Sequence, residues 1–306
     1  MDRRALGTLE ISTVGVGCNN FGARLDQAGA TRVVHAALEV GVNFFDTADV
    51  YGATESERFL GKALGARRGE AVVATKFGMP LDDKRFGASP AYVRSACEDS
   101  LARLGTDYLD LYQLHYPDAT VPIADTLGAL HELIAEGKVR EIGCSNFNVE
   151  QLRAARTAAG DGPAFVSVQN QFSLLDRSPE RDGVLKACDE LELSFLPFYP
   201  LANGLLTGKF RPGEAIPEGT RLALMSPERS VHWLSEEFQQ RVAALLEFAE
   251  RDQVPILTLA FSWLLDHPRV ASVIAGASNA EQIRANVKAS THLSDVQRRE
   301  LDRLSS

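Results

Sequence analysis

Four side chains able to move protons stand at or just beyond the ends of short apolar runs in the first part of the chain. They are Asp46, Tyr51, Lys76 and His115. A free tyrosine, with a pKa of about 10, is a poor acid at neutral pH, but a neighbouring ammonium stabilises its phenolate. We therefore expect Lys76 to lower the pKa of Tyr51, while Asp46 keeps Lys76 charged. His115 could hydrogen-bond a substrate oxygen and set its direction. The chemistry indicated is reversible proton donation to a carbonyl oxygen as it becomes an alkoxide.

Each of these residues taken alone also has an ordinary structural explanation. Asp46 could cap a loop, Tyr51 could lie on the surface, and Lys76 could belong to a structural ion pair. His115 could be a satisfied core histidine. The combination argues for a site, because an apolar strand that ends in a lysine places an ammonium where desolvation is costly unless an anion lies beside it.

A proton donor of this kind needs a second reactant that supplies electrons. The six histidines form no H-E-x-x-H pattern and the four cysteines form no C-x-x-C pattern, so we expect no metal site. The second reactant is therefore expected to be an organic cofactor. Ser145, Asn146 and Gln169 follow or end later apolar runs and could pair with a carboxamide, although loop capping would explain them equally well.

Two later segments have the composition of phosphate-binding loops. The run Phe198–Lys209 begins with an aromatic ring and continues through Gly, Thr and Lys, which suits a pyrophosphate. The second segment begins at Gly276 and leads into a helix that carries Gln282 and Asn286. Free N–H groups at the start of that helix, together with Ser278, would face another phosphate. Two phosphate positions indicate a dinucleotide.

The elements that would hold these residues alternate along the chain. Apolar runs of strand length are expected at Val14–Gly17, Asn43–Asp46, Val72–Lys76, Leu109–His115, Ile142–Ser145, Val166–Gln169, Ser194–Phe198 and Val273–Gly276. Amphipathic segments of helical period lie between them, at Thr31–Val40, Ser56–Leu64, Pro90–Leu104, Ile123–Glu136 and Val149–Ala159. This alternation predicts an α/β fold in which the parallel strands and their helices form a single (β/α)8 TIM barrel domain over residues 1–306.

Further segments are expected to decorate this barrel. A β-hairpin at Ala5–Ser12 would precede the first barrel strand, and helices near Glu236–Asp252 and Ile256–Asp266 would fill a long insertion after the seventh. An added helix is expected at Ser294–Leu304. An open doubly wound sheet is an alternative, but Asn20 stands where its G-x-G-x-x-G fingerprint needs a third glycine. Two separate domains are the other alternative, and no linker-like stretch supports them.

Charge and hydropathy limit the partners. Asp and Glu outnumber Lys and Arg by 41 to 32, for a net charge of −9, which argues against nucleic acid and anionic membrane surfaces as partners. The longest apolar stretch, Ile256–Leu265, is interrupted by Thr258 and Ser262 and is too short to span a membrane. No signal-peptide pattern follows the N-terminal arginines, and the cysteines are scattered, so we expect a cytoplasmic protein with reduced thiols. The sequence is silent on oligomeric state.

The same residues, in the same order along nearly the whole chain, make the sequence similar to the aldo-keto reductase superfamily. Bacterial members and proteins akin to potassium-channel β subunits are the most similar branch. The segment Asn43–Gly52 resembles the family's stretch with the catalytic Asp and Tyr, and Thr75–Gly78 resembles the stretch with its Lys. His115 lies in Leu114–Asp118, which resembles the stretch with the family's His.

The resemblance also implies a nicotinamide dinucleotide site. Gly137–Phe147 resembles the segment whose Ser and Asn contact the nicotinamide carboxamide, Gln169 stands at the position of a third carboxamide partner, and Phe198 stands where an aromatic ring stacks on the nicotinamide. The cofactor-binding residues that the resemblance implies are Gly17, Asp46, Ser145, Asn146, Gln169, Phe198, Leu201, Asn203, Leu205, Lys209, Gly276, Ser278, Gln282 and Asn286.

Two departures from the family pattern bear on the choice of cofactor. Ala275 stands where the family usually has Pro, and Gly276 and Gln282 replace the Lys and Arg that many members direct at the 2′-phosphate. Ser278, Gln282 and Asn286 match a second family variant that still binds the phosphorylated cofactor. The resemblance therefore favours NADPH, with NADH as the alternative.

These inferences predict an NADPH-dependent oxidoreductase that reduces aldehydes or ketones to alcohols, with Tyr51 as the general acid. The partner is a small-molecule aldehyde or ketone, and no natural substrate is implied. The residues expected to line the substrate pocket are Phe21, Tyr51, Phe77, His115 and Tyr116, although Phe21, Phe77 and Tyr116 could equally pack under loops. One rival hypothesis is a cofactor-sensing regulatory module with negligible turnover. The other is a barrel lyase or isomerase that forms a Schiff base on Lys76.

Overall fold

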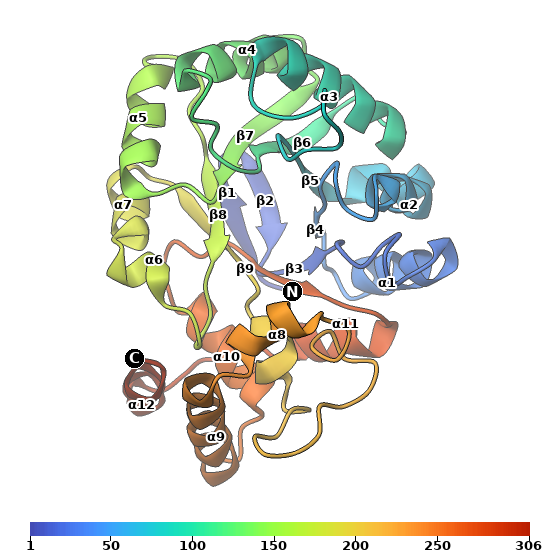
Figure 1. Cartoon of the computed structure of the whole chain (residues 1–306). Helices are drawn as coiled ribbons and strands as arrows, with labels where there is room; N and C mark the ends of the chain where they lie inside the picture. The colour runs from blue at the N-terminus through green and yellow to red at the C-terminus, as the bar shows by residue number, and fades with distance from the viewer.

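The computed structural model describes residues 1–306, apart from the side chain of Arg229. Eight strands form one parallel sheet in the order β10-β3-β4-β5-β6-β7-β8-β9. They are β3 Val14–Gly17, β4 Phe44–Asp46, β5 Val72–Phe77, β6 Leu109–Leu114, β7 Val139–Ser145, β8 Ser167–Gln171, β9 Ser194–Phe198 and β10 Val273–Gly276. The two outer strands of this order meet where Phe195 of β9 bridges Val270, just before β10. The sheet therefore curls into a nearly closed barrel, and the (β/α)8 prediction is confirmed (Figure 1).

All eight expected strands are present, and β3, β9 and β10 have the expected bounds. β7 begins earlier than expected because Val139 already pairs with Leu109 of β6. β8 continues beyond Gln169, since Gln171 pairs with Phe198. β6 ends at Leu114, so the histidine that follows it lies in the loop directly beyond the strand.

Helices surround the barrel, one after most of its strands (Figure 1). They are α1 Gln27–Glu39, α2 Glu55–Leu64, α3 Pro90–Leu104, α4 Ile123–Ala135, α5 Val149–Ala159, α6 Ser178–Arg181, α7 Val184–Glu190 and α11 Ala280–Lys288, with a 3-10 turn, η1, at Gly65–Glu70. α1 begins before the predicted Thr31 because the Asp26 side chain caps it by accepting from the Gly29 N–H. α3 has the predicted bounds, with Pro90 in its first turn and the left-handed Gly105 as its C-cap. Within the described residues, no helix has both the length and the apolar character needed to cross a membrane.

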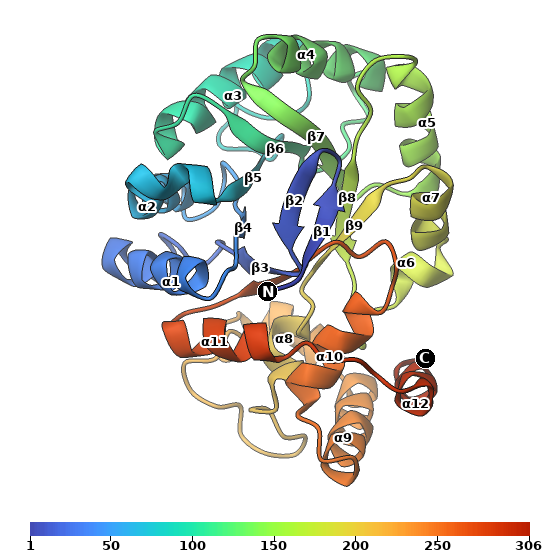
Figure 2. The ribbon, with the colours of Figure 1, turned by 180° about the vertical axis from the view of Figure 1, so that it is seen from behind.

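An antiparallel hairpin, β1 Arg3–Leu6 and β2 Leu9–Ser12, covers the amino ends of the barrel strands, which confirms the predicted N-terminal hairpin (Figure 2). Its Leu6 and Ile11 are fully buried. They form one apolar cluster with Phe44, Ala74, Leu111, Leu196, Ala271 and Ile274. This apolar cluster packs the hairpin against the barrel where the strands begin, so we expect a ligand site at the other end, where the strands end.

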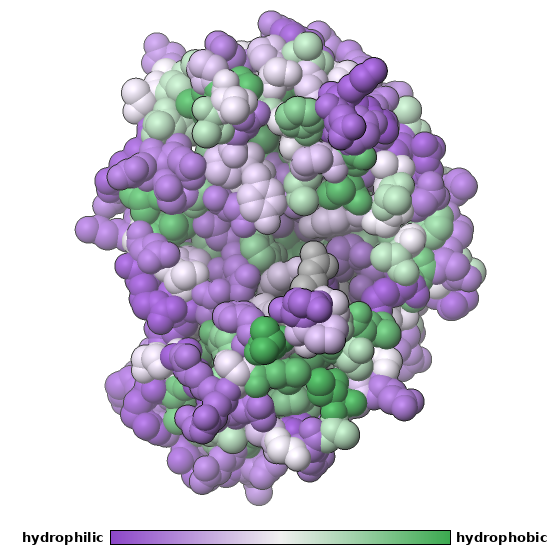
Figure 3. Space-filling model, viewed as in Figure 1, coloured by the Kyte–Doolittle hydropathy of each residue, from purple (hydrophilic) through white to green (hydrophobic). Residues whose placement is uncertain are grey.

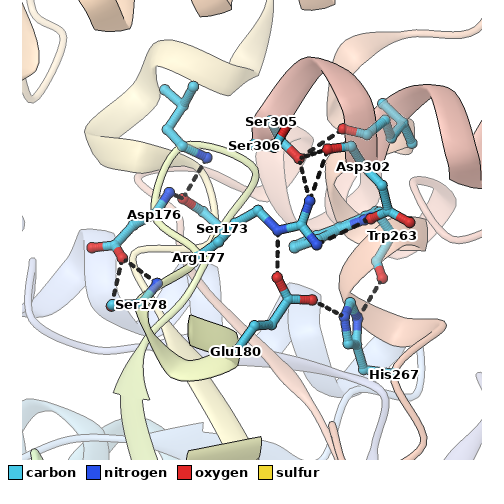
Figure 4. A network of polar contacts seen from close by, with 12 residues as sticks. Ser173, Asp176, Arg177, Ser178, Glu180, Trp263, His267, Asp302, Ser305 and Ser306 are labelled. Atoms are coloured by element: carbon cyan, nitrogen blue, oxygen red, sulfur yellow. Dashed lines mark hydrogen bonds and ion pairs between the residues drawn. The ribbon is translucent and has the colours of Figure 1, made fainter. Parts of the chain in front are cut away.

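The segment between β9 and β10 holds η2 Ala202–Thr207, α8 Pro227–Trp233, α9 Glu236–Arg251 and α10 Ile256–Leu265. The sequence predicted α9 and α10 and missed the short α8. The C-terminal helix α12, Asp295–Ser305, was also predicted, and Figure 4 shows how it is held. Arg177 lies between Glu180 and Asp302 and donates to both residues, and Glu180 also accepts from His267 at 3.1 Å. This network ties α12 to the loop after β8 and to the end of α10.

Candidate active site

The four predicted proton-transfer residues meet at the carboxyl end of the barrel. Asp46 is the last residue of β4, Lys76 lies near the end of β5 and His115 follows β6, while Tyr51 belongs to the loop between β4 and α2. The strands are neighbours and parallel, so their carboxyl ends open onto the same space. Lys76 is fully buried, and Asp46 and His115 are 4% and 7% exposed.

Lys76 and Asp46 form a buried ion pair. The Lys76 ammonium lies 2.8 Å from each carboxylate oxygen of Asp46 and 2.8 Å from the backbone oxygen of Thr47. Burial opposes the charge of Lys76, but Asp46 and Tyr51 overcome that effect and raise the pKa of the ammonium above its ordinary value. Lys76 is therefore a fixed positive charge inside the barrel.

Tyr51 lies over this charge, with the Lys76 Nζ 5.1 Å from the centroid of its ring. The sequence predicted that Lys76 would lower the pKa of Tyr51, and the net direction is the opposite. Burial of the phenol is the largest effect and raises its pKa, while Lys76 lowers it through its charge and a hydrogen bond. The prediction named the correct opposing charge and omitted desolvation of the hydroxyl.

His115 completes the group as a neutral ring. It makes a T-shaped contact with Tyr51, with the ring centroids 5.8 Å apart, and Tyr116 stacks on it at 5.6 Å. Burial, reinforced by the Lys76 ammonium, lowers the pKa of His115 to about 3. His115 is therefore uncharged at neutral pH and can share a single N–H with an oxygen in the cavity.

The group opens into a cavity of about 930 Å³, which is near the upper end of the usual size for ligand sites. The view onto this end of the barrel shows a hollow near the middle of the face (Figure 3). Tyr51 and His115 lie in its wall, and loop residues 216–222 also line it. The cavity continues from the proton-transfer group to the ends of β9 and β10.

Three amide and hydroxyl side chains are connected beside the ion pair. The Ser145 hydroxyl donates to the Gln169 backbone oxygen at 2.7 Å, and the Asn146 amide donates to the same hydroxyl at 3.0 Å. Asn146 also donates to the His115 backbone oxygen, and its φ of 62° places it in the left-handed region. Gln169 in turn donates to Asp46 at 2.8 Å. These side chains therefore connect the ends of β7 and β8 to the ion pair.

Three cationic side chains line the outer part of the cavity: Arg24, Lys209 and Arg221. Arg24 donates to the Gly219 backbone oxygen at 2.6 Å, and Arg221 donates to the Tyr199 hydroxyl at 3.2 Å. Burial and the charge of Arg221 lower the pKa of Arg24. Among the described side chains, neither arginine forms an ion pair with a carboxylate. Glu218 lines the same part of the cavity, so the three cations outnumber the acid there and the rim carries a net positive charge, although the protein is acidic overall.

Comparison with known proteins identifies the family. The model of the aldo/keto reductase family matches residues 13–306. The chain belongs to this family. It is 36% identical over 295 residues to an uncharacterized oxidoreductase of Bacillus subtilis, covering 94% of this chain and 91% of that protein. It is 33% identical to a probable voltage-gated potassium channel subunit beta of Arabidopsis thaliana, covering 92% and 88% of the two chains.

The fold agrees with this assignment. The solved structure of an aldo-keto reductase from Bacillus halodurans in its holo form superimposes with a TM-score of 0.82 at 34% identity, over 100% of this chain and 97% of that chain. The resemblance inferred from the sequence is thus confirmed, and this aldo/keto reductase is an oxidoreductase built on a (β/α)8 barrel.

Most residues predicted to bind ligands in this aldo/keto reductase lie in the wall of the cavity. They are Gly17, Asp46, Tyr51, His115, Tyr116, Ser145, Asn146, Gln169, Phe198, Leu201, Asn203, Lys209, Gly276, Ser278 and Gln282. The Gln282 side chain accepts from the backbone N–H of Ser278 at 2.8 Å, so these two residues form one unit at the start of α11.

Four other predicted residues do not line the cavity. Side chains alternate along a strand, so Lys76 points into the barrel and Phe77 points outward, where it packs against Tyr112 at 4.6 Å. Phe21 is fully buried in the core between the barrel and its helices, and Leu205 on η2 belongs to the same core. Asn286 is buried one turn beyond Gln282 on α11.

The sequence did not identify Arg24 or Arg221 as cavity residues. Both lie in long loops, after β3 and after η2, and only the folded loops bring their guanidinium groups together. A weak signal was available, because Arg221 follows a loop rich in Pro and Gly that lies directly beyond the predicted pyrophosphate segment. The described residues contain no group of three or more His, Cys, Asp or Glu side chains arranged to hold a metal ion.

Proposed function

We propose that the protein reduces aldehydes or ketones to alcohols with NADPH, and that Tyr51 is the general acid. The observation that carries this proposal is the position of Tyr51 in the cavity wall, over the ammonium that Asp46 holds. A phenol placed against a fixed cation can release its proton to an alkoxide, because the phenolate left behind is stabilised.

The residues present fit a nicotinamide dinucleotide. Ser145, Asn146 and Gln169 offer hydroxyl and amide groups to a carboxamide beside Tyr51, and a bound dihydronicotinamide would supply a hydride to the carbonyl carbon. Asn203 supports the fit independently, because it is 6% exposed and both atoms of its amide lack a hydrogen-bond partner among the described residues. A buried amide of this kind is explained by a ligand that satisfies it.

Proton transfer then follows from the residues of this chain. The substrate oxygen would lie between the Tyr51 hydroxyl and the neutral ring of His115, which orients it. As negative charge develops on that oxygen, Tyr51 transfers its proton, and Lys76 stabilises the phenolate that forms. Asp46 keeps Lys76 charged throughout, because their ion pair is almost fully buried. Alcohol oxidation follows the same steps in reverse.

The cations at the rim support NADPH over NADH. Arg24, Lys209 and Arg221 can meet phosphate groups, while Ser278 and Gln282 offer further polar contacts at the start of α11. These groups compensate for the absence of Lys and Arg at positions 276 and 282. The location that this proposal implies is the cytoplasm, where reduced NADPH and reduced thiols are both maintained.

The test is an absorbance assay of a panel of aldehydes and ketones with NADPH and NADH side by side. We expect turnover with at least one carbonyl class and a preference for NADPH. Tyr51→Phe should lower kcat by about 10²–10⁴-fold while cofactor affinity is retained. Tyr108→Phe is the matched control, because that ring lies between Arg68 and Arg140 before β6, away from the cavity. Unchanged turnover in Tyr51→Phe would end the assignment.

The similarity to probable channel β subunits favours one second candidate, a cofactor-binding regulatory protein with negligible turnover. Tight NADPH binding without turnover of any carbonyl in the panel would support it. The Schiff-base hypothesis is weakened, because the Lys76 Nζ is fully buried and its three hydrogen bonds go to Asp46 and Thr47. An amine in this state is not free to attack a carbonyl.

A further inference from the structure

The segment that carries Tyr51 contains a buried acid with no partner. Asp49 is fully buried, and neither of its carboxylate oxygens has a hydrogen-bond partner among the described residues. Its backbone N–H donates to the Lys76 backbone oxygen at 3.1 Å, so Asp49 lies directly behind the catalytic pair. The mechanism above gives this carboxyl group no role.

The charged groups around Asp49 are already engaged with other residues. Glu57 of α2 accepts from Arg103 of α3 and from the Thr75 hydroxyl, and both Arg103 and Glu57 are buried. Lys76 directs its ammonium at Asp46 and Thr47. Three charged groups around Asp49 shift its pKa: Glu57 on α2, Arg103 on α3 and Lys76 on β5. Asp49 in turn raises the pKa of Tyr92 on α3 and of Tyr112 on β6. None of them donates a hydrogen bond to its carboxylate.

An ionised carboxylate to which no side chain donates is costly inside a protein, and a protonated one is much less so. Burial and the nearby Glu57 raise the pKa of Asp49 to about 7, against the smaller opposing effects of Arg103, the backbone N–H of Val50 and Lys76. Nearby, the Tyr92 hydroxyl is also buried and without a partner in the described residues. The side chains around Asp49 therefore suit a neutral acid.

We propose that Asp49 is a positioning residue that holds the Tyr51 segment in its active arrangement while it carries a proton, and that loss of this proton releases the segment. The proposal rests on the function assigned to Tyr51 above. Asp49 is close along the chain to the residues that hold the catalytic groups. Tyr51 donates its backbone N–H to the backbone oxygen of Ala48, and the backbone oxygen of Thr47 accepts from the Lys76 ammonium. A shift of Asp49 toward solvent would therefore displace both Tyr51 and Thr47, whose backbone oxygen holds the Lys76 ammonium.

The same segment has the means to move. Ala53 and Thr54 have φ angles of 53° and 77°, a left-handed conformation that is unfavourable for residues other than glycine. Val50, which lies between Asp49 and Tyr51, borders the main cavity and also a second surface cavity of about 680 Å³. Ala53 and Thr54 line that second cavity. An ionised Asp49 could therefore reach water by a local rearrangement of a segment that is already strained.

The test compares wild type with Asp49→Asn, which keeps the size of the side chain and cannot ionise. We expect the kcat of wild type to fall as the pH rises through 7, by about tenfold between pH 6 and pH 8, with little change in the Kd for NADPH. Asp49→Asn should lack this decline. Asp107→Asn, at an exposed position before β6, is the matched control and should keep the wild-type profile. Parallel profiles for wild type and Asp49→Asn would overturn the proposal.

Two measurements keep this test separate from the proposed reaction. The melting temperature of the cofactor-free protein should fall between pH 6 and pH 8 in wild type, and Asp49→Asn should remove that fall. Carboxyl ¹³C resonances of wild type labelled at aspartate should include one that titrates near pH 7 and disappears in Asp49→Asn. If both hold and no carbonyl is reduced, only the proposed reaction fails. If no such resonance exists, Asp49 does not carry the proton, whatever the activity.

Discussion

Gln169 and Asp46 share a hydrogen bond across the barrel, with the Gln169 Nε2 at 2.8 Å from the Asp46 Oδ1. The same oxygen accepts from Lys76 at 2.8 Å, and the amide of Gln113 approaches it at 3.5 Å. The amide proposed to meet the cofactor therefore also stabilises the carboxylate that holds the catalytic ammonium. One side chain links cofactor binding to the charge of the Lys76 and Asp46 pair.

Replacement of Gln169 by Leu should therefore affect two steps at once. A hydrogen bond to a charged group contributes about 1.5–3 kcal/mol, so we expect cofactor affinity and kcat each to fall by about 10- to 100-fold. Fluorescence titration with NADPH measures the first effect and steady-state kinetics the second. Gln240→Leu, on α9 away from the cavity, is the control. A loss of affinity with unchanged kcat would show that Gln169 does not act through Asp46.

Lys76→Met should destabilise the fold as well as remove turnover. The substitution leaves the Asp46 carboxylate buried without its cation, and loss of one partner of a buried pair typically costs about 3–5 kcal/mol. The double variant Asp46→Asn with Lys76→Met removes both charges, so part of the stability should return while turnover stays absent. Urea unfolding at neutral pH measures this. A double variant as unstable as Lys76→Met would contradict the account of the pair.

His115 should make the protein less stable as the pH falls. Its pKa in the folded protein is about 3, below the ordinary value of 6.5. Between these pH values the unfolded chain binds a proton at His115 and the folded chain does not. The stability that neutral His115 contributes is complete above pH 6.5 and is lost progressively as the pH falls toward 3. Between pH 6.5 and pH 5 the expected loss is about 2 kcal/mol. Urea unfolding at the two pH values should show this loss, and His115→Gln should reduce it.

The sequence was sufficient to predict the strands, the barrel and the proton-transfer group, because each of them depends on local patterns that recur along the chain. Apolar runs of strand length alternate with amphipathic helices, and the reactive residues stand at the carboxyl ends of consecutive strands. The position of Phe77 was predictable by the same logic. Adjacent residues on a strand point to opposite faces, so Phe77 and Lys76 could not both face the cavity.

The direction of the Tyr51 pKa shift and the cations at the rim could not be predicted from the sequence, for a different reason. Desolvation of Tyr51 depends on how completely its neighbours exclude water, and charge patterns do not report that quantity. Arg24 and Arg221 belong to loops that are almost two hundred residues apart along the chain and meet only in the folded protein. The unpartnered carboxyl of Asp49 likewise becomes visible only once the bonds of Glu57 and Arg103 are known.

Arg221 provides the sharpest test of the cofactor preference. It has no carboxylate partner among the described side chains, and its guanidinium lies 4.9 Å from the centroid of the Tyr199 ring. Its charge also lowers the pKa of the nearby Arg24. A phosphate placed beside it would gain charge-assisted hydrogen bonds without having to break an ion pair first. Arg221→Ala should therefore weaken NADPH binding by about tenfold or more, and this loss should shrink as salt concentration rises.

The comparison with NADH decides which phosphate Arg221 serves. If Arg221 contacts the 2′-phosphate, Arg221→Ala should leave the affinity for NADH nearly unchanged and reduce the difference in affinity between NADPH and NADH. Equal losses for NADPH and NADH would instead assign Arg221 to the pyrophosphate, which both cofactors carry. Arg299→Ala, an exposed arginine on α12, controls for the change in net charge. No loss for either cofactor would contradict a phosphate role for Arg221, because an uncompensated guanidinium in the cavity wall must interact with an anion bound there.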